Sequence, residues 1–209
     1  MADGSPDLSL RADADGSPQD QRRAQILDAA RICFARHGFH GASMHQICAE
    51  AKMSPGALYR YYPSKEAIIE AIAEDERSKA MTVMAAFQAE GSLVDRITAC
   101  GIAYMRLMQR PASGQLMVEI CAESMRNTSV GERFHVIECD IRKEFLAAFG
   151  AAQAAGQISA EIDLEVALKV LMSIGDGLVM RMGLEPDMTP EAVEPFLRRI
   201  AAAVFRLDA

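Results

Sequence analysis

The chain has 209 residues, half of which are apolar. This length is enough for one sizeable hydrophobic core, or for a small domain joined to a medium one. Because no apolar run reaches the length of a membrane span, and because no basic start leads into an apolar segment at the N-terminus, we expect a cytoplasmic protein without membrane helix or export signal.

The formal net charge of −7 is distributed unevenly along the chain. Residues 1–20 carry −4, residues 21–65 carry +5, and residues 66–209 carry −8. A basic segment within an acidic chain is what a local contact with a polyanion requires, although solvent-exposed surfaces often vary by this much. The charge pattern therefore permits nucleic-acid binding by residues 21–65 without establishing it.

The cysteines and histidines do not indicate a metal site. The five cysteines are far apart, form no CxxC pair and lie in apolar helix-like surroundings: Cys33, Cys48, Cys100, Cys121 and Cys139. We expect them to be buried reduced thiols, with a redox sensor as the alternative. No histidine pairs with a cysteine or carboxylate at ligand spacing, and no nucleophile, base and acid converge in sequence. We therefore predict no metal, no cofactor and no catalytic residues.

In chain order, residues 1–20 are acidic and rich in Asp, Gly and Pro, which predicts a disordered acidic tail. Helical periodicity begins at Gln21 and places apolar residues such as Ile26 and Phe34 on one face. Gly38 then predicts the end of this helix, and Ser43 is a favourable N-cap for the next one.

Residues 43–66, SMHQICAEAKMSPGALYRYYPSKE, predict two short helices separated by a tight turn, which is a helix-turn-helix. Ser54 and Pro55 provide the N-cap and first position of the second helix. Ile47, Met53 and Leu58 point inward in this pattern. Short helix pairs also occur in all-α enzymes, so at this point DNA binding and a helical enzyme both remain open.

The rest of the chain is predicted to be helical as well. A long helix starts at Ser64 and runs towards Gln88, and further helices are expected near 92–109, 112–127, 129–155, 163–183 and 190–206. Pro195 predicts a kink in the last helix or a later start. Because no stretch shows sustained strand alternation, the predicted fold class is all-α.

Residues 26–68 resemble the signature of the tetracycline-repressor (TetR) family of transcriptional regulators. The matching parts are Ile26, Ala29-Ala30, Phe34, His37-Gly38-Phe39, Ser43, Ile47, residues 54–62 (SPGALYRYY) and Lys65-Glu66. The resemblance implies a three-helix DNA-binding domain over 21–80, followed by a helical ligand-binding and dimerisation domain over 81–209. Lys52 stands where the family usually has glycine, so we expect a non-glycine residue at positive φ in the turn.

The same resemblance implies which residues contact operator DNA. Tyr59, Arg60, Tyr61 and Lys65 would contact phosphates, Ser43 would cap its helix beside the backbone, and Tyr62 would be packing. His45, Gly56 and Ala57 would approach base edges. The predicted DNA-binding residues are Ser43, Met44, His45, Pro55, Gly56, Ala57, Tyr59, Arg60, Tyr61 and Lys65.

The later segments 117–127 and 171–183 resemble a TetR subgroup that includes regulators of choline and betaine metabolism. Thirteen methionines favour an adaptable apolar pocket, although methionine stripes are more often ordinary core. The candidate ligand-binding residues are Met105, Met108, Met117, Cys121, Met125, Phe134, Ile137, Met172, Asp176 and Met180. For Glu119 and Glu123, surface or interhelical pairing is favoured over a cationic ligand, and for Asp176 a structural hydrogen bond is the first interpretation.

Apolar stripes on 163–183 and 190–206 predict a homodimer, because in this family the last two helices pair in a four-helix bundle. The predicted interface residues are Leu168, Leu171, Gly175, Leu178, Phe196, Ile200 and Val204. The alternative is that both stripes serve only the core of one protomer.

Taken together, these patterns predict a dimeric DNA-binding repressor that a small hydrophobic or amphipathic inducer releases from its operator, controlling an efflux or catabolic operon. A ligand-independent regulator or activator is the alternative, and a helical enzyme is less favoured. The helix from Ser64 to Gln88 is expected to be the only long element that touches both domains and therefore to transmit the signal.

Overall fold

The computed structural model describes residues 17–88, 90–126 and 128–206. Within these ranges the secondary structure is helical, without strands, and the all-α prediction is confirmed. The elements are α1 (Pro18–Gly41), α2 (Met44–Glu50), α3 (Pro55–Tyr61), α4 (Lys65–Ala85), the short 3₁₀ helix η1 (Ala86–Gln88), α5 (Leu93–Met108), α6 (Ser113–Ser124), α7 (Thr128–Ala154), α8 (Leu164–Leu184) and α9 (Pro190–Phe205). The expected helix limits beyond residue 91 agree to within three residues.

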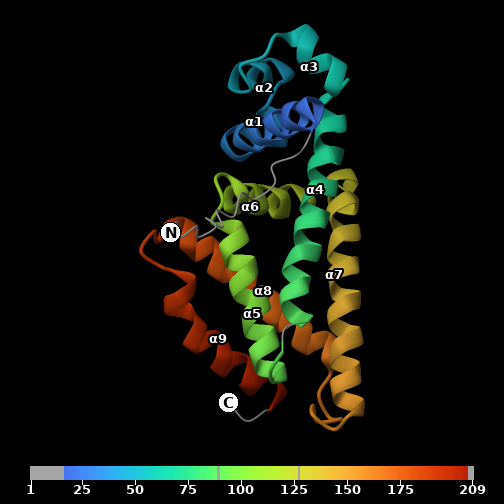
Figure 1. Cartoon of the computed structure of the whole chain (residues 1–209), viewed down its shortest axis with the longest axis vertical. Helices are drawn as coiled ribbons and strands as arrows, with labels where there is room; N and C mark the ends of the chain where they lie inside the picture. The colour runs from blue at the N-terminus through green and yellow to red at the C-terminus, as the bar shows by residue number, and fades with distance from the viewer. Residues whose placement is uncertain (1–16, 89, 127, 207–209) are drawn as a thin grey trace, which may run out of the picture.

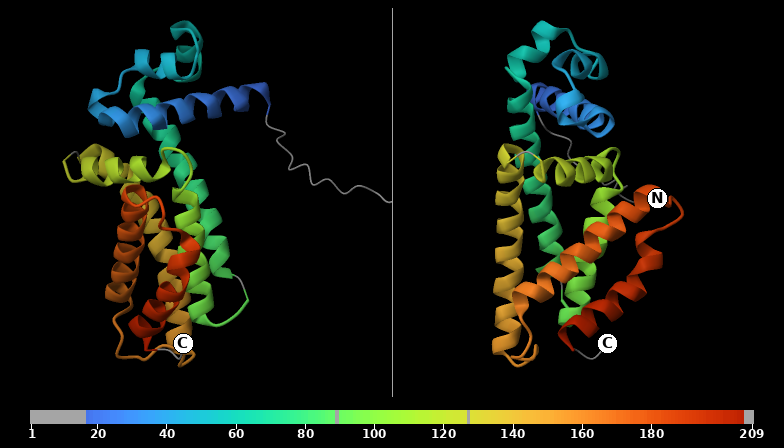
Figure 2. Two further views of the ribbon diagram at one scale, coloured as in Figure 1. Left: turned by 90° about the vertical axis from the view of Figure 1, so that its left-hand side faces the viewer. Right: turned by 180° about the vertical axis from the view of Figure 1, so that it is seen from behind.

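The helices form a small unit at one end of an elongated bundle (Figure 1). α1, α2 and α3 make up the small unit, and α4 runs from it down the length of the molecule beside α7. α5, α8 and α9 complete the bundle, while α6 lies across its top beneath α1 (Figures 1 and 2). α4 continues unbroken across residue 80, so no linker separates the two predicted domains there. None of the helices in the described ranges has the length and apolarity needed to cross a membrane.

The first helix begins earlier than the sequence pattern indicated. Ser17 caps it, its hydroxyl accepting from the backbone N–H of Asp20, whose carboxylate accepts from the Ser17 N–H in return. This capping box, with Pro18 at the first helical position, adds residues 18–20 to α1. The expected tail therefore ends before Ser17, and its residues 1–16 lie outside the described residues.

Serine caps set the starts of the helix-turn-helix elements, as expected. Ser43, Ser54 and Ser64 each accept a hydrogen bond from the backbone N–H three residues later, which fixes the starts of α2, α3 and α4. Lys52 has φ 52°, which confirms the expected left-handed residue in the turn. At the other end of the chain, α9 begins at Pro190, capped by Thr189, and continues past Pro195. Pro195 therefore does not delay the start of this helix.

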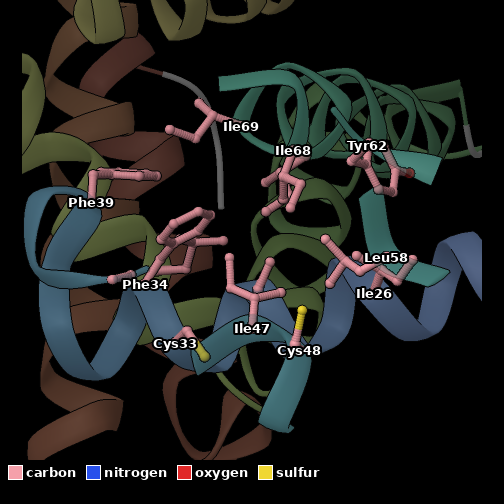
Figure 3. Close-up of a cluster of buried hydrophobic side chains, with 14 residues drawn as sticks. Ile26, Cys33, Phe34, Phe39, Ile47, Cys48, Leu58, Tyr62, Ile68 and Ile69 are labelled. Atoms are coloured by element: carbon pink, nitrogen blue, oxygen red, sulfur yellow. The ribbon is translucent and has the colours of Figure 1, made fainter. Parts of the chain in front are cut away.

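The core of the small unit includes one residue from α6. The buried residues of this first cluster are Ile26, Ala30, Cys33, Phe34, Phe39, Ala42, Ile47, Cys48, Leu58, Tyr62, Ile68, Ile69, Ile72 and Leu116, most of which Figure 3 shows. Leu116 belongs to α6, and Ile120 on the same helix packs against the cluster. The small unit and the bundle thus share apolar packing. Among the cysteines, Cys33, Cys48 and Cys100 are buried as expected, whereas Cys121 and Cys139 are exposed.

Gly38 interrupts α1 near its end. Its φ of 69° and ψ of 168° lie in a region of backbone space that is essentially restricted to glycine. A Cβ atom at this position would lie 2.8 Å from Glu119 Oε1 on α6. The kink therefore lets the end of α1 turn back and contact α6.

Gly38→Ala is expected to lower the free energy of unfolding by about 1–3 kcal/mol, since alanine must adopt the same strained backbone. Gly150→Ala is the matched control, because Gly150 lies within α7 and a Cβ there would meet nothing within 4 Å. The control should be neutral or stabilising by up to about 1 kcal/mol. Urea unfolding of both variants provides the measurement, and equal stabilities would contradict the role of Gly38.

Candidate functional site

α2 and α3 form the predicted helix-turn-helix at the end of the molecule. Ile47, Ala51 and Leu58 are buried as expected, and Met53 packs at the edge of the first cluster. The turn between the helices is closed by the Met53 N–H, which donates to the Cys48 carbonyl at 3.0 Å. These contacts fix the angle between the two helices and leave one face of α3 in solvent.

Six of the ten predicted DNA-binding residues are exposed, and four of these lie on α3. Pro55, Gly56, Tyr59 and Arg60 are exposed and Ala57 is half-buried; on α2 and its cap, Ser43 and His45 are exposed. A Cβ at Gly56 would meet nothing within 4 Å, so close approach by another molecule is sterically open there. Met44 and Tyr61 differ from the expectation, because both are half-buried against the first cluster. Tyr62 is buried, as the resemblance implied, with Arg23 above its ring.

Lys65 has a partner within the protein that sequence analysis did not predict. Its Nζ donates to the carbonyls of Phe39 and Ala42, at 2.6 and 3.0 Å, where α1 ends. These carbonyls would otherwise lack helical partners, so the lysine satisfies them and ties the start of α4 to the end of α1. One N–H of the ammonium remains for a phosphate, and that contact stays a prediction.

Arg60→Ala should weaken DNA binding about equally for all sequences and reduce the slope of log K against log salt by about one unit. The reason is that Arg60 is exposed and makes no ion pair with the described residues, so its charge is available to a phosphate. The control is Arg181→Ala, an exposed arginine of α8 that pairs with Glu185 at 3.2 Å. An unchanged slope in Arg60→Ala would remove this residue from the interface.

A cavity of about 830 Å³ lies inside the bundle, lined by α4, α5, α6, α7 and α8 with Leu197 of α9. Several predicted ligand-binding residues line it: Met108, Met117, Cys121, Phe134, Ile137, Met172 and Asp176. Most of the wall is apolar, formed by aliphatic, aromatic and thioether side chains. A cavity of this size and lining can hold a drug-sized molecule.

Three predicted ligand-binding residues do not line this cavity. Met105 is 1% exposed and packs instead with Ile102 and Val193 between α5 and α9. Met125 follows the end of α6 and is 85% exposed, and Met180 lies on the outer face of α8. The sequence analysis chose these methionines by residue type, but the rotation of each helix about its axis decides which of its residues line the cavity.

Sequence analysis missed the polar lining residues Glu76, Thr98, Tyr104, Ser113, Ser124, Thr128, Glu132, His135, Glu138, Lys169 and Ser173. Spacing held a signal for Tyr104, because Ile97, Gly101, Tyr104 and Met108 form one helical stripe that lines the cavity. Without knowledge of the facing helices, that stripe could not be distinguished from ordinary core.

Tyr104 and Asp176 meet across the cavity between α5 and α8. The Tyr104 hydroxyl donates to Asp176 Oδ1 at 3.0 Å, which confirms the structural hydrogen bond expected for Asp176. Burial raises the pKa of Asp176, and Glu138 raises it further, while the Tyr104 hydrogen bond acts in the opposite direction. Burial also raises the pKa of Tyr104, with a contribution from Asp176.

α6 lines the cavity and packs against α1, beneath which it lies in Figure 1. Met117 and Cys121 line the cavity, while Glu123 is buried and its Oε1 lies 2.8 Å from Nε2 of His40 at the end of α1. Arg126 pairs with Glu123 at 3.3 Å. The expected interhelical pairing is thus present for Glu123, whereas Glu119 pairs with Arg126 just past the end of its own helix, at 4.0 Å. α4 makes a second connection, because Arg31 of α1 pairs with Glu76 at 3.2 Å and with Asp75.

The outer face of α8 carries an exposed stripe. Residues 166, 170, 173, 177, 180 and 184 are all exposed and alternate in steps of four and three, and Val166, Val170, Met180 and Leu184 are large apolar members. Phe196 on α9 is 61% exposed and Ile200 is half-buried. We define these exposed residues of α8 together with Phe196 and Ile200 as the α8–α9 face.

The remaining predicted interface residues face inward instead. Leu168, Leu171 and Gly175 line the cavity. Leu178 packs towards Ile102, and Val204 packs against the second cluster of buried residues, around Phe149. The predicted apolar stripe of α8 therefore packs within its own protomer, which was the alternative that the sequence analysis left open. A second stripe, rotated around the same helix, remains exposed.

Two family models match the chain. The model described as bacterial regulatory proteins, tetR family, matches residues 26–72. The model of the C-terminal domain of BetI-type transcriptional repressors matches residues 93–206, more than half of the chain.

Relatives and solved structures agree with these matches. The HTH-type transcriptional regulator UidR of Escherichia coli (strain K12) is 42% identical over 113 residues, which cover 52% of this chain and 54% of UidR. The chain thus matches about half the length of this curated relative. The structure of Salmonella enterica GusR is 36% identical, covers 91% of this chain and 98% of GusR, and has a TM-score of 0.74. AibR in complex with isovaleryl coenzyme A and operator DNA shares the fold at 21% identity, over 90% of this chain and all of AibR, with a TM-score of 0.69.

Proposed function

The chain belongs to the TetR family of bacterial transcriptional regulators, and we propose that it is a homodimeric repressor that leaves its operator when a small molecule fills the cavity. The observation that carries this proposal is the position of α6, which forms part of the cavity wall and also contributes Leu116 to the core of the DNA-binding unit. Because the cavity suits an apolar small molecule, we further propose an efflux or catabolic operon as the target.

The exposed end of α3 supports DNA recognition. Ser54 caps the helix and Pro55 occupies its first position, so the backbone N–H groups at this end and the small residue Gly56 face solvent. Such a helix end favours a phosphate and can enter the major groove. His45 is exposed on α2, which supports its proposed contribution to sequence preference. AibR, which shares the fold, is described in complex with operator DNA.

The α8–α9 face supports dimerisation. Its α8 stripe repeats every three and four residues, which is the pattern of a helix that packs along a second helix. Exposed apolar side chains at this density mark an interaction surface rather than a solvated one. A second copy packing the same face against it would form a four-helix contact and place two α3 helices on one DNA.

Phe196→Glu should convert the dimer to monomers and strongly reduce operator affinity, because an unpaired charge buried at an apolar interface costs several kcal/mol. Val136→Glu is the matched control: Val136 is 58% exposed on α7, outside the α8–α9 face. Light scattering and analytical ultracentrifugation report the assembly. A stable dimer of Phe196→Glu would place the interface elsewhere.

Signal transfer is proposed to use both α4 and α6. The sequence pattern singled out α4, but the structure shows that α6 touches the cavity on one face and α1 on the other. A molecule in the cavity that prefers one position of α6 would shift His40 and the end of α1 with it. The separation of the two α3 helices in the dimer would then no longer match half-sites about one DNA turn apart.

This mechanism predicts reciprocal coupling of about 5–150-fold. Operator DNA is selected from a random pool with the protein, and a cavity ligand is identified by a thermal-shift screen. Calorimetric titration of that ligand should then show weaker binding to the operator-bound protein than to the free protein.

His40→Ala should reduce this coupling while leaving ligand affinity for the free protein unchanged. His37→Ala is the control, because His37 is exposed near the same end of α1. Equal ligand affinities for free and operator-bound wild-type protein would rule out release by this ligand, however tightly it binds.

A further inference from the structure

The wall of the cavity carries more carboxylates than cationic groups. Its charged lining residues in the described part of the chain are Glu76, Glu132, Glu138, Asp176 and Lys169. His135, which also lines the cavity, would add at most one further positive charge. Glu132, Glu138, Lys169 and Asp176 are exposed, so they lie where the cavity opens to solvent, and the excess of carboxylates there favours a cation over an anion as the occupant.

Asp176 differs from Glu76 and Glu138 in its partners. Glu76 Oε1 accepts from Arg31 and from Lys79 at 3.2 and 3.0 Å, and Glu138 lies 3.6 Å from Arg142. Within the described ranges, no Lys, Arg or His nitrogen lies within ion-pair distance of Asp176. Its hydrogen-bond partner there is the neutral Tyr104 hydroxyl, which uses Oδ1 and leaves Oδ2 available to a ligand.

Three polar groups from three other helices line the same cavity as this carboxylate of α8. They are Tyr104 of α5, Cys121 of α6 and Glu138 of α7. Of these, Tyr104 contacts Asp176 directly through the 3.0 Å hydrogen bond. Burial, Asp176 and Glu138 all raise the pKa of the Cys121 thiol. Around the group, Met117, Phe134 and Met172 provide an apolar surface.

We propose that the cavity binds a protonated primary or secondary amine on an apolar body, and that Asp176 is the residue that anchors its ammonium group. Tyr104 holds the carboxylate in place, and Glu138 adds a second negative charge nearby. The apolar body of the ligand would then lie along the methionine and phenylalanine side chains. This inference deepens the proposed function, on which it rests for the role of the cavity as the effector site.

Lys169 provides the competing possibility. It lies seven residues before Asp176 on α8, a separation of about 10 Å along the helix axis. A ligand bearing a carboxylate would pair with this lysine and would avoid Asp176. The two possibilities predict opposite preferences among probes that differ only in the charge of the head group.

Octylamine, octanol and octanoate form such a series, with the same chain and a cationic, neutral or anionic head. Calorimetric titration into the free protein near pH 7.5 is expected to give octylamine an affinity at least about tenfold higher than octanol. Octanoate should bind no more tightly than octanol. A preference for octanoate that Lys169→Met removes, or equal affinities for all three, would overturn the proposal.

Asp176→Asn should bring octylamine down to the affinity of octanol and leave octanol binding unchanged, because asparagine keeps the volume and can still accept from Tyr104. Asp187→Asn, in the exposed connection between α8 and α9, is the matched control and should keep the wild-type preference. Circular dichroism establishes that each variant is folded. If Asp176→Asn proves unfolded, Glu138→Gln takes its place and should lower the preference for octylamine over octanol about threefold. An unaltered preference in whichever of these variants is folded overturns the proposal.

Two measurements on the wild-type and variant proteins distinguish a failure of the amine site from a failure of the proposed function. The calorimetric preference is measured without DNA, whereas operator binding is measured by fluorescence anisotropy on DNA selected from a random pool. An amine preference in a protein that binds no selected DNA would support the amine site and contradict the repressor. Operator binding without an amine preference would support the repressor and contradict the amine site.

Discussion

The packing of α6 against α1 is the contact on which the arrangement of the whole molecule depends. Leu116 is buried in the core of the DNA-binding unit, although it comes from a helix that closes the cavity. Beside it, the buried carboxylate of Glu123 meets His40 of α1. A buried carboxylate without such partners would be costly, so the polar contact holds the two helices in one relative position. Gly38 makes the approach possible, since its backbone turns α1 back towards α6.

The carboxylates in the cavity wall differ in the kind of partner that they have. Some carboxylates are neutralised by partners that reach away from the cavity, as Glu76 is by Arg31 of α1. Asp176 is held by a hydroxyl instead of a cation. The first arrangement ties the cavity to the DNA-binding unit, while the second leaves a charged group available to an occupant. Carboxylates in the wall of one cavity therefore differ in whether a cation or a hydroxyl holds them.

The fold was largely predictable from the sequence because its signals are local. Serine caps at Ser43, Ser54 and Ser64 and the breaks between apolar stripes set the helix limits, and these depend on a few neighbouring residues. The start of α1 was missed because its capping box lies in a segment whose composition resembles a tail.

The candidate sites were less predictable because they depend on how helices are rotated against each other. On α8 one stripe lines the cavity and another is exposed, and both are apolar, so composition alone assigned Leu168 and Leu171 to the wrong surface. Lys65 shows the same limit at a single position. Its partners, Phe39 and Ala42, are more than twenty residues away in sequence and meet it only in the folded unit.

The burial of Leu116 in the first cluster also bears on how such regulators can be recombined. Hybrid sensors are built by joining the DNA-reading half of one regulator to the chemical-sensing half of another. In this chain a cut after α4 would leave the reading half without Leu116 and without the packing of Ile120, and would expose apolar surface of the first cluster. A working graft would have to carry the matching surface of α6 along with its new partner. The part that has to be transferred together is therefore not continuous in sequence. Whether two halves are compatible depends on how well their α1 and α6 surfaces fit each other.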